Sequence, residues 1–205
     1  MIGQGKVGAG ASDKSHSDGL ALDLRLGGLG DIISSQLHGR YAETTYRKNT
    51  YVIANQAGVT HSAALTTTFV GICVGNPSTS TVNLHMLGFG WALLVACAAT
   101  SAIGIMTGAG TITGALTPRN RYVGQPAGQG LATGGMTLPG TPVLEQIFGQ
   151  VGTVAITSWG PDPGHWIDLG ASVILPPGTF VASYMTTASG ASGFIGSFLW
   201  EEVPI

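Results

Sequence analysis

The chain has 205 residues, of which 44% are hydrophobic and only 9% are charged, and its net charge at pH 7 is −2. A protein that binds nucleic acid through a basic face carries a clear excess of cations, so no nucleic-acid partner is expected. The 33 glycines follow no strict period, which excludes a collagen-like chain. This length suits one domain with an additional arm, or at most two small domains.

Charge is distributed very unevenly along the chain. Eleven of the charged residues precede Asn49, and the 70 residues from Asn49 to Pro118 contain no Asp, Glu, Lys or Arg. Because a free monomer needs surface charge to stay dispersed, a chain that omits charge is expected to be covered by something else. The two covers considered are lipid and other protein subunits.

Residues 1–48 are predicted to form an extended N-terminal arm. Residues 1–19 are polar and Gly/Ser-rich, and they lack the apolar core of a secretory signal. Apolar residues then alternate with other residues at Leu20, Leu22, Leu24 and Leu26. A period of two gives an extended segment one apolar edge, so these leucines are candidate interface residues.

Residues 49–205 are predicted to form an all-β body, a β-sandwich or jelly roll, because short strand-like runs alternate with turn signals. Gly88 or Gly90 is expected to bend one of these strands. A long Gly/Thr/Pro-rich loop is expected at 107–142, where Arg119 and Arg121 are candidate interface residues. The runs lie at 51–54, 66–74, 81–95, 102–106, 143–148, 151–156, 171–175, 179–187 and 193–200.

The segment Met86–Met106 is apolar and long enough to span a bilayer, with Thr100 and Ser101 as its only polar residues. However, no basic residue flanks it closely, and it opens with the alternation of a strand. A buried pair of strands is therefore favoured over a membrane span.

No arrangement of residues predicts catalysis, a metal site or a cofactor. The histidines and cysteines lack metal-ligand spacing, and His61-Ser62 is interpreted as a polar pair in a turn. Glu201 and Glu202 are adjacent on a strand, so they point to opposite faces and cannot share one site. The two cysteines, Cys73 and Cys97, are expected to be buried free thiols, with a disulfide as the alternative.

Two tryptophans form the one candidate ligand surface. Trp159 and Trp166 lie in the sequence SWGPDPGHWID, close to two aspartates. Indole rings stack on apolar faces, so the pair could bind a receptor or a glycan. A structural loop packed by tryptophan is the alternative, and the sequence favours it.

The blocks YVIANQAGVTHSAALTTTFVGICVGNPSTSTVNLHMLGFGWAL (51–93) and LPPGTFVASYMTTASGASGFIGSFLWEEVPI (175–205) resemble a group of small structural proteins of tailed bacteriophages. The shared features are an Asn-Gln-Ala-Gly entry, Thr-rich strands, an Asn-Pro turn, a Pro-Gly turn and a closing Trp-Glu-Glu-Val-Pro. The resemblance implies a virion component with a β-sandwich or jelly-roll body, which often assembles as a trimer. It brings no catalytic residues.

Together these observations predict a non-enzymatic virion structural protein, made in the host cytoplasm. Its expected role is capsid decoration, or cement: it oligomerises and contacts other virion proteins, such as the major capsid protein, through its arm and its 107–142 loop. The alternative is a receptor- or glycan-binding fibre or tail protein.

Overall fold

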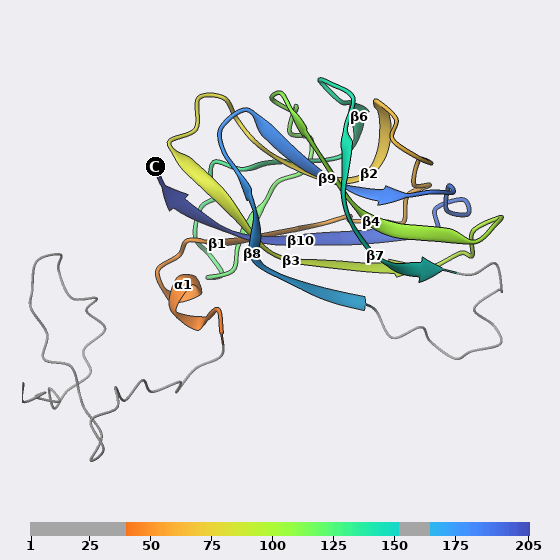
Figure 1. Ribbon diagram of the computed structural model, residues 1–205. Coiled ribbons are helices and arrows are strands. Elements are labelled where there is room, and N and C mark those ends of the chain that lie inside the picture. Colours follow the sequence, from red (N-terminus) through yellow and green to blue (C-terminus); the bar gives the residue numbers. More distant parts are fainter. Residues whose placement is uncertain (1–39, 152–164) are drawn as a thin grey trace, which may run out of the picture. The chain divides into compact units, whose positions relative to one another are not determined.

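The computed structural model of the chain describes residues 40–151 and 165–205 (Figure 1). The four leucines of the predicted arm, Leu20, Leu22, Leu24 and Leu26, lie outside the described residues, and so does Trp159.

The body is a β-sandwich of two antiparallel five-stranded sheets, which confirms the predicted all-β, jelly-roll-like fold (Figure 1). The first sheet has the order β5 (Arg119–Asn120), β1 (Thr50–Ala54), β10 (Phe194–Pro204), β3 (Val82–Leu93) and β8 (His165–Leu175). The second has the order β6 (Leu131–Thr137), β2 (Thr68–Asn76), β9 (Thr179–Met185), β4 (Ser101–Ala109) and β7 (Val143–Val151).

The first strands of the body pair with its last strands in the sequence, and the strands between them pair in the same way. β1 pairs with β10, β2 with β9, β3 with β8, and β4 with β7. This pairing is that of a double-sheet jelly roll, in which strands distant in sequence become neighbours. It brings the two blocks at 51–93 and 175–205 together, since their strands alternate within both sheets.

A β-bulge interrupts β3 at the expected place. Gly88 pairs with Leu199 and Met86 pairs with Trp200, so Leu87 is the extra residue on its strand. The bulge switches which residues of β3 face the core: Leu84 and Met86 are buried before it, and Phe89 and Trp91 after it. The bend expected at Gly88 or Gly90 is therefore a bulge at Leu87, directly before Gly88, and it keeps both halves of a long strand in the core.

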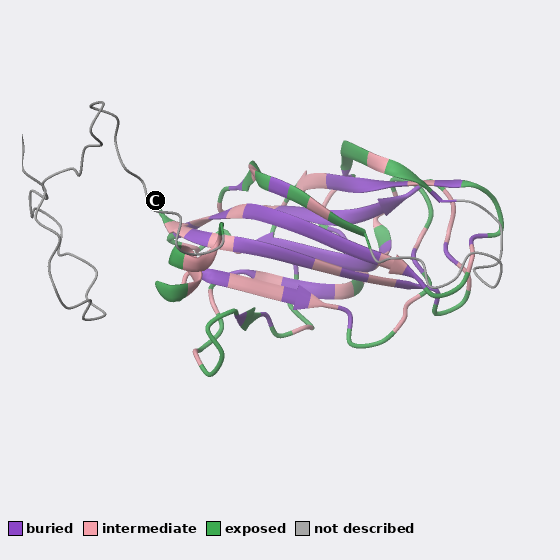
Figure 2. Ribbon diagram, turned by 90° about the horizontal axis from the view of Figure 1, so that it is seen from below, coloured by how far each residue is buried: buried purple, intermediate pink, exposed green. Residues whose placement is uncertain are grey.

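Two apolar clusters lie on opposite faces of the second sheet. Val181 and Met185 of β9 belong to the large cluster between the sheets. Phe180, Ala182 and Tyr184, which alternate with them, belong to a second cluster. Because successive side chains of a strand point to opposite faces, β9 is buried on both faces, and buried residues accordingly run along whole strands (Figure 2).

The stretch expected to be a long loop at 107–142 closes the second cluster. It contains the end of β4, the short β5 and all of β6, and it supplies the buried residues Ile112 and Leu138. The prediction of a continuous loop is therefore wrong, because the Gly- and Thr-rich strand β6 carries little apolar signal. Part of the uncharged sequence is thus covered by the chain itself.

The compact body begins at Tyr41 rather than at Asn49. The short helix α1 (Ala42–Tyr46) has an ion pair on its surface, between Arg47 Nε and Glu43 Oε1 at 2.8 Å. Tyr41 Oη donates a hydrogen bond to Asp168 Oδ1 of β8 at 2.7 Å. Residues 41–48, assigned to the arm from sequence, therefore belong to the body.

The apolar segment Met86–Met106 forms most of β3 and the first part of β4, as the strand interpretation predicted. Within residues 40–151 and 165–205, no helix has the length and apolar character needed to cross a membrane.

Candidate functional site

The edge strand β7 exposes the clearest group of apolar side chains. Among the described residues it pairs with β4 alone. Leu144 and Ile147 lie on one face of the strand and are 39% and 43% exposed, whereas Val143, which is adjacent to Leu144, points to the other face and is 65% exposed. Its only charged residue is Glu145, which accepts a hydrogen bond from Thr107 Oγ1 at 3.0 Å. An exposed edge strand presents unpaired backbone groups in addition to its side chains, so β7 is a candidate assembly surface.

Strand β7 is both held in place and irregular. Phe148 packs against Phe89 of the opposite sheet, with ring centroids 5.8 Å apart. Two register shifts relative to β4 bend the strand. Bulges at a sheet edge interfere with indiscriminate strand pairing, so this edge favours contact through side chains over a simple extension of the sheet.

A second uncharged surface lies at one end of the sandwich. The loops 55–67, 94–100 and 186–193 contain no Asp, Glu, Lys or Arg, and they expose Leu65, Leu94 and Val95. Hydrogen bonds tie the loops together: Leu94 N–H donates to Gly193 O at 2.7 Å. This end combines hydroxyl-bearing and apolar residues without formal charge.

The predicted interface residues Arg119 and Arg121 flank Asn120 on the free edge of the first sheet. Both are exposed, whereas Asn120 is buried and its Nδ2 donates to the backbone oxygen of Lys48 at 2.6 Å. The contact brings Lys48 next to the two arginines, and its Nζ lies 5.6 Å from the Tyr122 ring centroid. The fold therefore gathers three exposed cations, although the sequence places Lys48 far from the arginines.

Glu202 has a structural position that the sequence did not indicate. As expected for adjacent strand residues, Glu201 is half-exposed and Glu202 points inward. The buried carboxylate of Glu202 accepts hydrogen bonds from the backbone N–H groups of Gln129 at 3.0 Å and Gly130 at 2.9 Å. It fixes the end of the segment that follows the arginines.

His61 forms a buried pair with Ser183, not with its sequence neighbour's hydroxyl. Nε2 of His61 lies 2.7 Å from Ser183 Oγ, and Nδ1 lies 2.6 Å from the backbone oxygen of Ser62. With Nδ1 protonated, Ser183 Oγ donates to Nε2 and accepts from the Ile72 N–H at 3.0 Å, so every group has a partner. Both side chains are almost completely buried, which denies a substrate access to the serine.

Burial also shifts the pKa values of His61 and of the two cysteines. It lowers the pKa of His61 from 6.5 to about 4, against the opposing effect of its hydrogen bonds. Burial raises the pKa of the Cys73 and Cys97 thiols. The two cysteines are free, so the expectation of buried thiols is confirmed and the disulfide alternative is wrong. Among the described residues, no group of His, Cys, Asp and Glu could hold a metal ion.

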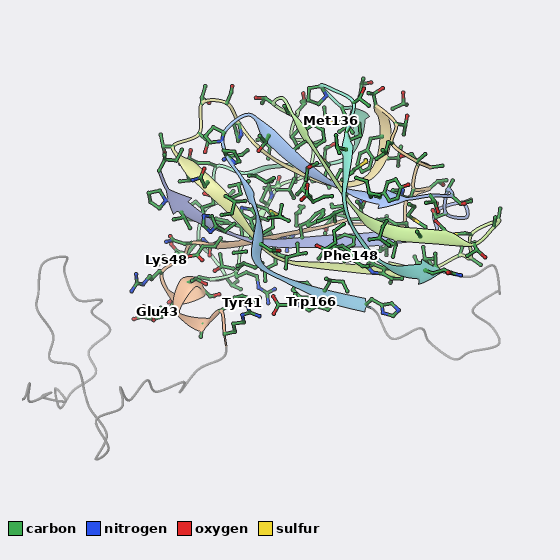
Figure 3. The ribbon with its side chains drawn as sticks, viewed as in Figure 1. Tyr41, Glu43, Lys48, Met136, Phe148 and Trp166 are labelled. Carbon is green, nitrogen blue, oxygen red and sulfur yellow. The ribbon has the colours of Figure 1, made fainter. Side chains whose placement is uncertain are left out.

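Trp166 lies on the outer face of the first sheet, and half of its side chain is exposed. Figure 3 shows it on the same side of the molecule as Tyr41, whereas Met136 of the second cluster lies on the other. Its predicted companion Trp159 lies outside the described residues.

Comparison with known protein families, with curated proteins and with solved structures finds no match for this chain.

Proposed function

We propose that this chain is a non-enzymatic structural protein of a tailed-phage virion, made in the host cytoplasm and acting as a capsid decoration, or cement, protein. In this role it forms a homo-oligomer, a trimer, and binds other virion proteins such as the major capsid protein. The resemblance of the blocks at 51–93 and 175–205 supports the virion assignment. The jelly-roll-like sandwich is compatible with it.

The observation that carries the proposal is the apolar surface of β7. Leu144 and Ile147 are exposed on one face of a strand with one charged residue, and Val143 is exposed on the other face of the same edge. Burial of apolar surface stabilises an assembly by about 25 cal/mol per Å². Stable interfaces bury on the order of 1,600 Å² in total, so β7 would form the centre of a contact that neighbouring loops extend.

The basic edge formed by Lys48, Arg119 and Arg121 supports a second contact of different character. Exposed cations contribute little to the stability of a monomer, but they steer association with an acidic partner surface. In the proposal, this edge and the N-terminal arm contact the capsid, while β7 contacts other copies of the chain. Both contacts act by adhesion, and no chemical step is involved.

The test is association with particles. Virions purified through a density gradient are probed for the chain by mass spectrometry, and stripped particles are then incubated with the full chain, a chain lacking residues 1–40, and Arg119→Ala/Arg121→Ala. We expect the full chain to be present in virions and to rebind, and both variants to rebind weakly.

Absence of the chain from purified virions would contradict the assignment itself. Equal rebinding of all three proteins would instead remove the arm and the arginines from the capsid contact. The double arginine variant retains the buried Asn120, which keeps the local backbone in place, so weak rebinding would not reflect a misfolded edge.

A further inference from the structure

A shallow platform lies on the outer face of the first sheet, around Trp166. The six-membered ring of the indole lies over Gly88 and Gly90 of the neighbouring strand β3: a Cβ atom at Gly88 would overlap the ring, and one at Gly90 would lie 3.1 Å from Trp166 Cε3. Only because both residues are glycines can the ring lie against the sheet. Half of the side chain remains exposed.

An oriented carboxylate lies beside the ring. Trp166 and Asp168 are two residues apart on β8, so they share a face and are about 7 Å apart. Asp168 Oδ1 accepts hydrogen bonds from Tyr41 Oη at 2.7 Å and from the Gly170 N–H at 2.9 Å. These contacts hold an exposed carboxylate in one orientation next to a flat apolar surface.

A hydroxyl group borders the platform on its other side. Gly90 pairs with Ser197 of β10 on one side and with Trp166 on the other. A Cβ at Gly90 would lie 2.7 Å from Ser197 Oγ, so the hydroxyl and the indole meet above the same glycine. The platform therefore combines one aromatic ring, one acceptor and one hydroxyl that can donate or accept.

We propose that the platform of Trp166, Asp168 and Ser197 binds a pyranose ring of a neutral saccharide. The apolar C–H face of the sugar lies on the indole, and its hydroxyls donate to Asp168 and exchange hydrogen bonds with Ser197. This pattern of an apolar wall with a few placed polar groups is the usual chemistry of a small-ligand site. The inference does not depend on the virion role.

The size of the apolar surface favours a sugar over a protein. The neighbours of Trp166 on β3 are glycines, and the residue of β10 that pairs with Gly90 is a serine, so the ring is bordered there by backbone and a hydroxyl and not by large apolar side chains. A protein interface buries roughly 800 Å² on each partner around a cluster of large residues. A single exposed indole matches the area of one pyranose ring.

The experiment is saturation-transfer NMR with the full chain and the methyl glycosides of glucose, galactose, mannose and N-acetylglucosamine, each at about 10 mM, where a site with a dissociation constant on the order of 1–10 mM is substantially filled. We expect transfer to the ring protons of at least one glycoside. Trp166→Ala should abolish it, and Asp168→Asn should weaken it several-fold.

Two further variants separate stacking from loss of structure. Gly88→Ala leaves Trp166 present but displaces its ring, so it should reduce binding as Trp166→Ala does. Ile174→Ala removes another exposed apolar side chain of β8 and should bind like the unchanged chain. Circular dichroism must show the same fold for all variants.

Absence of saturation transfer from all the glycosides would overturn the proposal. Transfer that persists in Trp166→Ala would also overturn it, because binding would then lie elsewhere. If Trp166 is instead covered by a second copy, the unchanged chain gives no transfer and Trp166→Ala lowers the mass in solution, which is a third contradicting result.

Discussion

The buried His61 makes folding stability depend on pH in a defined window. Its pKa is about 4 in the folded chain and 6.5 as an unperturbed group, because burial penalises the imidazolium. Between these values the unfolded chain binds a proton that the folded chain excludes. The stability that the neutral, buried His61 contributes is therefore fully present above pH 6.5. It falls as the pH drops and is completely lost below pH 4.

The size of the effect follows from the shift. A difference of one pKa unit corresponds to 1.36 kcal/mol, so the full shift corresponds to about 3 kcal/mol. About 2 kcal/mol of this is lost between pH 7 and pH 5, before most exposed carboxylates take up protons. For a domain whose total stability is typically about 5–15 kcal/mol, this is a large fraction.

The assay is urea unfolding at closely spaced pH values from 7 to 4.5, followed by tryptophan fluorescence. His61→Gln removes the titrating group, and His85→Gln removes a partly exposed histidine as the matched control. We expect a steep loss of stability in the unchanged chain and in His85→Gln, and a much flatter profile in His61→Gln. His61→Gln also loses the hydrogen bond to Ser183, which lowers the stability at every pH. The slopes against pH are therefore compared, and not the absolute stabilities.

Equal slopes for His61→Gln and the unchanged chain would refute the reasoning. This result would mean that His61 is protonated in the folded state, and hence that the sandwich opens at the loop that carries His61.

Three further predictions concern the packing of the body. Glu202→Gln should lower the free energy of unfolding by about 2 kcal/mol, because one backbone N–H then faces an amide donor, whereas Glu201→Gln should change it by less than about 0.5 kcal/mol; chemical denaturation measures both. Ile112→Ala should lower the free energy of unfolding by about 3 kcal/mol, because it leaves a cavity in the second apolar cluster. A decrease below about 1 kcal/mol would contradict the closure of that cluster by residues 107–142. Neither cysteine should react with a thiol reagent until the chain is unfolded in denaturant, and rapid reaction of the folded chain would show that the thiols are accessible.

The fold could be predicted because its strands carry local signals. Runs such as Tyr51–Ala54 and Thr179–Thr187 combine strand-forming residues with clear turns at their ends, and both are strands in the structure. Gly88, one of the two glycines at which a bend was expected, lies next to the bulge in β3. Strand β6, with the sequence LATGGMT, has no such signal, since its pairing with β2 and not its composition makes it a strand.

What covers the uncharged strands could not be predicted from sequence alone. The uncharged strands suggested cover by lipid or by other subunits, yet Phe180 and Tyr184 of β9 are buried under residues of the same chain. A one-dimensional pattern shows that a strand is buried on both faces, but it does not show by what. Within the described residues, the exposed apolar side chains of β7 and of the loops at one end of the sandwich remain for an external partner to cover.

The candidate sites depend on contacts across long stretches of sequence. Ser183 is 122 residues from His61, and the glycines beneath Trp166 lie on another strand. Trp166 could be selected as one of the two tryptophans of a candidate ligand surface, whereas its support by Gly88 and Gly90 appears only when β3 and β8 pair. The sequence therefore identified a residue of the platform without indicating how its ring is held.

Light scattering of the full chain without detergent tests whether the chain assembles through β7, as proposed. We predict a discrete trimer, which Ile147→Glu dissociates and which the matched change at another exposed isoleucine, Ile205→Glu, leaves intact. A monomer at concentrations of about 10–100 μM, well above the dissociation constants of stable oligomers, would contradict the claim, and so would a trimer that Ile147→Glu leaves unchanged.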